Sequence, residues 1–166
     1  MTTDEFELVA GREPGGRFED YVQSLTHLRS RTLTALGFTL IPIFFILDFF
    51  MMPQALLGRF ALYRLVATAL VLAQYLIIRN TAPHRFSVCH GYVFSLIAAG
   101  MIALMTTDLS GFNSTYYAGL NLVMIAANML LPWRAMHSAI NCFLIIGLYV
   151  GLNLVFPGEE PVSQVA

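Results

Sequence analysis

Long apolar runs, separated by short breaks, decide what this chain can fold into. Five runs carry very few charged side chains, and each approaches the roughly 20 residues that a helix needs to cross the hydrocarbon core of a membrane. They cover about 33–52, 61–78, 87–106, 116–131 and 135–156. Hydrophobic residues form 57% of the 166 residues and charged residues only 11%, which excludes an ordinary soluble domain. We therefore predict an all-α fold, a polytopic transmembrane helical bundle with five spans, cut before a sixth.

The segments outside the runs complete this organisation. Residues 1–16 show no signal-peptide pattern and are expected to form a disordered cytoplasmic lead. Residues 17–32 repeat apolar side chains at helical spacing, which predicts an amphipathic helix leading into the first span. The bundle itself extends over residues 33–156. Residues 157–166 are expected to be an extracytoplasmic tail or a truncated loop.

The basic residues orient the bundle in the membrane. All nine are arginines, and only Arg59 and Arg64 lie at the side to which the first span leads. The other seven lie at the opposite side: Arg12, Arg17, Arg29, Arg31, Arg79, Arg85 and Arg134. Basic residues are enriched in cytoplasmic connections, so we predict a cytoplasmic N-terminus.

Four histidines fall at the same predicted cytoplasmic side and are the strongest indication of chemistry. They are His27, His84, His90 and His137. Imidazole is a common axial ligand of haem iron, and depth in the spans pairs His90 with His137 and His27 with His84. Two alternatives stay open: amphipathic histidines resting at the lipid headgroups, and a zinc or copper site, although no carboxylate or cysteine lies at a supporting spacing.

If haem is bound, it is expected to be non-covalent haem b, because the chain contains no Cys-x-x-Cys-His motif. Arginines at the same side can form forked contacts with the haem propionates. The candidates for this role are Arg29, Arg31, Arg85 and Arg134.

Polar residues also mark the opposite, outer side. Asp48 lies inside the first apolar run, where an acidic residue is a candidate for function and where Arg64 is its expected partner. A purely structural ion pair is the alternative. Tyr116 opens the fourth run, as a membrane-interface anchor or as part of a ligand pocket. Asn121 and Asn128 lie seven residues apart on one face, where they can link helices or line the same pocket.

Several stretches resemble a known group of membrane domains. The run LGFTLIPIFFILDFFMMPQ, the Pro-His-Arg turn and STYYAGLNLVMIAANMLLPW are similar to the six-helix membrane anchors of bacterial class III adenylate cyclases and, more distantly, of quorum-sensing receptor histidine kinases. One branch of the cyclase anchors carries a four-histidine signature like that of diheme cytochrome b subunits. The resemblance, over about residues 18–156, implies a multi-pass protein of the bacterial inner membrane, two b haems, and a response to the quinone pool.

The leading hypothesis is therefore a haem-b redox receptor domain that senses quinone or quinol and regulates a fused cytoplasmic effector, an adenylate cyclase. A homodimer or higher oligomer is expected. The main alternative is a receptor for a lipophilic, autoinducer-like signal, with Asp48, Tyr116, Asn121 and Asn128 at its pocket and no haem. A third is a structural dimerising anchor. No nucleophile–base pair or phosphate-binding loop is visible, so we expect no catalytic residue in this chain.

Overall fold

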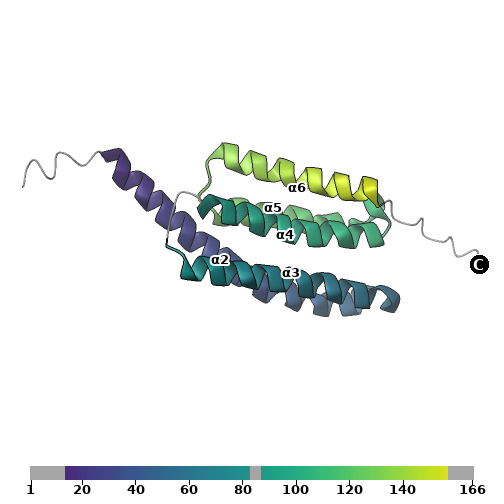
Figure 1. The fold of residues 1–166 in the computed structure, drawn as a ribbon. Coiled ribbons are helices and arrows are strands. Elements are labelled where there is room, and N and C mark those ends of the chain that lie inside the picture. Colours follow the sequence, from purple (N-terminus) through teal and green to yellow (C-terminus); the bar gives the residue numbers. More distant parts are fainter. Residues whose placement is uncertain (1–13, 83–86, 157–166) are drawn as a thin grey trace, which may run out of the picture.

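The fold is a bundle of α-helices joined by short connections (Figure 1). The computed structural model describes residues 14–82 and 87–156, with side chains from residue 21 onward, and these residues contain no strand. The elements are α2 (Pro14–Met51), α3 (Gln54–Asn80), α4 (Ser87–Asp108), the 3-10 turns η1 (Gly111–Asn113) and η2 (Thr115–Tyr117), α5 (Ala118–Leu130) and α6 (Ala135–Val155).

The prediction of an all-α transmembrane bundle is confirmed. Four helices, α2, α3, α4 and α6, are long and apolar enough to cross a membrane, and the chain is a multi-pass membrane protein. Large apolar side chains also cover the outside of the bundle, as Phe50, Met129 and Phe143 illustrate with exposed fractions of 78%, 82% and 76%. Such a surface is stable against lipid and not against water.

The fourth predicted span has a different form from the others. Its residues fold into η2 and α5, and the 13 residues of α5 rise only about 20 Å, less than the roughly 30 Å of a hydrocarbon core. The chain turns directly after α4 at Ser110 and Gly111, whose backbone angles are left-handed, with φ of 79° and 59°. The chain then passes through two 3-10 turns before α5 begins.

The first helix is continuous through both of its predicted parts. α2 contains 38 residues and therefore rises about 57 Å. It runs without interruption from the segment predicted to be amphipathic into the first span. Its N-terminal part extends beyond the ends of the other helices (Figure 1).

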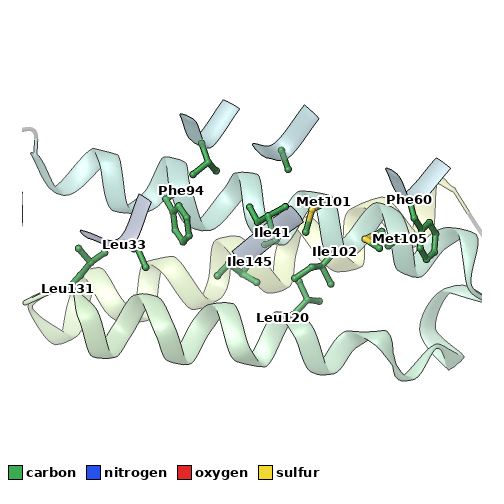
Figure 2. Close-up of a cluster of buried hydrophobic side chains, with 13 residues drawn as sticks. Leu33, Ile41, Phe60, Phe94, Met101, Ile102, Met105, Leu120, Leu131 and Ile145 are labelled. Carbon is green, nitrogen blue, oxygen red and sulfur yellow. The ribbon is translucent and has the colours of Figure 1, made fainter. Parts of the chain in front are cut away.

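Helix α4 is the centre of the bundle. It contacts α2, α3, α5 and α6, and it is the most buried of the four long apolar helices. Its side chains Phe94, Met101, Ile102 and Met105 belong to the hydrophobic core (Figure 2). The remaining buried members of this core are Leu33, Ile41, Phe60, Ala67, Val71, Ala99, Leu120, Leu131 and Ile145.

Two glycines allow the close contacts around α4. A Cβ atom at Gly37 of α2 would overlap the ring of Phe94, and one at Gly91 of α4 would overlap Trp133 and Leu131. Glycine at these two positions therefore lets α2 and the connection between α5 and α6 approach α4 closely.

Candidate functional site

A buried network of charged and polar side chains lies at the end of the bundle where α2 meets α3. Asp48 and Arg64 have exposed fractions of only 2% and 6%. Arg64 donates through Nε to Asp48 Oδ2 at 2.5 Å and through Nη2 to Asp48 Oδ1 at 3.0 Å. The predicted partnership of these two residues is confirmed.

Tyr116 joins this ion pair from a third part of the chain. Its hydroxyl accepts a hydrogen bond from Arg64 Nη2 at 2.9 Å and donates one to Asp48 Oδ1. A fourth donation from the arginine goes from Nη1 to the Ile41 carbonyl at 3.0 Å. We call Asp48, Arg64 and Tyr116 the outer network. Its two opposite charges cancel, which is the form in which charges are tolerated inside an apolar layer.

Local chain geometry brings the three residues together. Asp48 lies in the last turn of α2, and the two-residue connection Met52–Pro53 turns the chain directly into α3, whose third turn carries Arg64. Ser114 fixes the start of η2, because its side chain accepts a hydrogen bond from the backbone N–H of Tyr116. The outer network thus links α2, α3 and the connection between α4 and α5.

An elongated pocket of about 530 Å³ begins at the outer network and extends along the helices. This volume lies within the range of small-molecule sites. Among the described residues, the polar side chains in its wall are those of Arg64, Thr115 and Tyr116, which lie at one end. The apolar wall consists of Leu33, Leu36, Gly37, Leu40, Ile41, Phe44, Met51 and Met52 of α2 and its connection, Phe94, Ala98, Met101 and Ile102 of α4, and Ala118, Gly119, Leu122, Val123, Ala126 and Leu130 of α5.

The two asparagines of α5 lie away from this pocket. Asn121 is exposed, and the side chain of Asn128 donates to Cys142 Sγ of α6 at 3.4 Å. Neither residue belongs to the pocket wall. Of the four residues that the sequence suggested as pocket residues, the structure brings Asp48 and Tyr116 together and places both asparagines elsewhere.

The described histidines lie at the opposite end, where α4 and α6 begin. His137 Nδ1 is 2.8 Å from the hydroxyl of Tyr92, and His27 Nδ1 is 3.4 Å from Ser87 Oγ. The backbone carbonyl of His90 accepts a hydrogen bond from Gln74 Nε2 at 2.5 Å. The fourth histidine, His84, lies outside the described residues.

The arginines predicted to contact haem propionates are at this end too. Arg29, Arg31 and Arg134 are exposed, and the guanidinium of Arg31 lies 6.0 Å from the ring centre of Tyr75. Arg85 lies outside the described residues. Within residues 21–82 and 87–156, no three His, Cys, Asp or Glu side chains come together as a metal site. A haem iron needs only two histidines, so the haem prediction stays a prediction.

Sequence reasoning missed most of the pocket. It identified Arg64 and Tyr116, which line the polar end together with Thr115, but the rest of the wall consists of ordinary apolar residues and glycines that no motif distinguishes from core residues. The sequence offered one signal, the small residues that line the pocket: Ala118, Gly119 and Ala126 on one face of α5, together with Gly37 of α2 and Ala98 of α4. Comparison with protein-family models, with curated proteins and with solved structures gave no match.

Proposed function

We propose that this chain is the membrane-embedded ligand-binding domain of a receptor for a lipophilic signal. The observation that supports the proposal is the apolar pocket with a single polar end, inside a multi-pass membrane bundle. Ligand sites combine a mostly apolar wall with a few polar groups that fix orientation, and this pocket has that composition. Leu36 and Leu40 of α2 and Leu122 of α5 line the pocket and are also exposed on the outside of the bundle, so a molecule dissolved in the bilayer would reach the pocket between these two helices.

The outer network restricts the chemistry of the ligand. A guanidinium has five N–H groups, and four of those of Arg64 are directed at Asp48, Tyr116 and Ile41. One N–H on Nη1 is left to bind an oxygen acceptor on a ligand. Because Asp48 already neutralises the arginine, an anionic head group would add an uncompensated charge inside the membrane. The expected ligand is neutral, with an apolar body and one small oxygen-bearing group.

The signal would be passed to a cytoplasmic effector fused to this domain. The distribution of arginines supports a cytoplasmic N-terminus and an orientation in which the outer network faces away from the cytoplasm. An adenylate cyclase in a bacterial inner membrane is the effector implied by the resemblance. Ligand binding would change the packing of α2 and α5 and so bias the effector between two states.

A photoreactive probe tests the ligand site. We suggest a medium-chain alcohol bearing a diazirine and an alkyne, crosslinked to the purified full chain in detergent and located by peptide mass spectrometry. Labelled residues should come from the pocket-lining parts of α2 and α5. Ala98→Phe and Ala126→Phe, which fill the pocket, should strongly reduce this labelling, whereas Ala73→Phe on the exposed face of α3 should not. Equal labelling of all three variants would contradict the proposal.

A haem-b receptor for the quinone pool is the second candidate. Its support is that His27, His90 and His137 all belong to the end of the bundle where α4 and α6 begin. Two neutral imidazoles would give low-spin haem, so a haem-supplemented sample should show a Soret band that shifts on reduction with dithionite. His90→Ala and His137→Ala should remove the same haem. A sample without a Soret band would end this candidate and leave the lipophilic-signal receptor untouched.

A further inference from the structure

Three polar side chains are buried where α4, α5 and α6 meet, away from the outer network and the histidines. Ser95 of α4 and Asn141 of α6 are completely buried, and Asn128 of α5 is partly buried. Several of their polar atoms have no hydrogen-bond partner among the described residues: Ser95 Oγ, Asn128 Oδ1, and both Oδ1 and Nδ2 of Asn141. We call these three residues the three-helix polar site.

The register of α4 and α6 brings two of them to one level. The two helices run in the same direction, and Tyr92 pairs with His137 while Thr106 pairs with Asn153. The partners are 45 and 47 residues apart in sequence. Ser95 therefore lies level with residues 140–142 of α6, and Asn141 is among the few buried residues of that helix.

Contacts of α5 place the third residue at the same level. Asn128 donates to Cys142 Sγ, next to Asn141 in sequence. Along α4, Gly91 lies beside Leu131 at the end of α5, and the helices run in opposite directions, so Asn128 lies level with Phe94. All three residues thus lie within about one helical turn, roughly 5 Å along the bundle.

We propose that ordered water molecules occupy the three-helix polar site and bridge α4, α5 and α6. Lipid and apolar side chains offer these groups no hydrogen bond, and buried polar groups in proteins are paired with protein or with ordered water. The free atoms include donors, the Ser95 hydroxyl and the Asn141 NH₂, together with acceptors on all three residues. None is charged, so the site suits a small neutral molecule that both donates and accepts, and water has this chemistry.

The bridge would have a positioning role for α6. The buried residues of this helix are Asn141, Ile145 and Asn153, so two of its three inward anchors are asparagines. Asn153 holds the helix directly, because it donates to Thr106 of α4 at 3.4 Å; its other bond, to the Tyr149 carbonyl, lies within α6. Asn141 would hold the helix through water. The inference does not depend on the nature of the ligand in the pocket.

A double-mutant cycle in thermal unfolding tests the bridge. In the purified full chain in detergent, Ser95→Ala and Asn141→Leu should each lower Tm by about 2–4 °C or more, and the double variant should lower it by less than the sum, because both remove one shared bridge. Ile145→Leu, one turn further along the same face, is the matched control with little effect. A rise in Tm for Asn141→Leu, or strict additivity, would overturn the proposal.

Radiolytic oxidation in ¹⁸O-labelled water separates a water bridge from a direct bond between Ser95 and Asn141. Bound water is a local source of hydroxyl radicals, so Cys142 should take up ¹⁸O although detergent surrounds the helices. The Ser95→Ala/Asn141→Leu variant should lose most of that uptake, while exposed Cys89 serves as the internal reference. Energetic coupling without ¹⁸O at Cys142 would mean a direct contact, and the water proposal would be wrong.

Discussion

The two ends of the bundle hold their polar residues in different ways. At the outer end, Asp48, Arg64 and Tyr116 come from three separate segments and form one network. At the other end, His137 is bound to Tyr92 and His27 lies near Ser87, each with its own partner. A buried charge must be neutralised by an opposite charge, which dictates its partner. A neutral imidazole is satisfied by any nearby hydroxyl, so histidines at one depth need not form one site.

The largest expected effect tests whether the outer end depends on charge balance. Arg64→Met leaves Asp48 as a buried, unpaired carboxylate and should lower the free energy of unfolding by about 3–5 kcal/mol. The double variant Asp48→Leu/Arg64→Met removes both charges and should recover much of this loss. Unfolding in mixed micelles measures both values. If the double variant is as unstable as the single one, apolar packing and not charge balance holds the outer end together.

Removing only the hydroxyl from the outer network should have a smaller effect. Tyr116→Phe deletes a donor to Asp48 and an acceptor for Arg64. Because hydrogen bonds to charged groups contribute about 1.5–3 kcal/mol, the variant should lower the free energy of unfolding by about that amount. Tyr117→Phe, at the exposed neighbouring position, is the control and should change stability little. If Tyr116→Phe lowered the free energy of unfolding no more than Tyr117→Phe does, Tyr116 would contact the ion pair without stabilising it.

The other end should respond to packing. Gly91→Val places a side chain where Trp133 and Leu131 already lie, and overpacking of this kind costs about 1–3 kcal/mol. Gly147→Val introduces the same side chain at an α6 position with nothing within 4 Å, which separates the steric effect from a general effect of valine in a helix. Similar melting temperatures for the two variants would argue against a close approach at Gly91.

The smallest effect concerns a second ion pair, between Arg59 and Asp108. Its arginine side chain has an exposed fraction of 65%, unlike the buried Arg64. Exposed ion pairs contribute about 0.2–1 kcal/mol, and Arg59→Gln should therefore change unfolding only within that range. A loss comparable to that of Arg64→Met would mean that burial does not explain the difference between the two pairs.

Sequence reasoning predicted the helices well because membrane spans follow directly from length and hydropathy. It predicted the Asp48–Arg64 pair for a similar reason, since few partners exist for a charge inside an apolar layer. It assigned residues 116–131 as a full span, because apolar composition does not reveal that Tyr116 and Tyr117 belong to a 3-10 turn and leave only 13 residues for α5. The pocket could not be predicted from the sequence either, because its wall depends on how α2, α4 and α5 pack and not on any residue type.

The length of α2 has a mechanical consequence. α2 is a continuous helix of about 57 Å that is bonded to Arg64 near one end, so a small rotation there produces a larger displacement at the other end. Pro14 lies about 51 Å along the helix from Asp48, so a tilt of about 5° at the Asp48 contact would move the start of α2 by about 4 Å. A molecule that binds between α2 and α5 would therefore displace the N-terminal end of α2 further than it displaces the contact at Asp48.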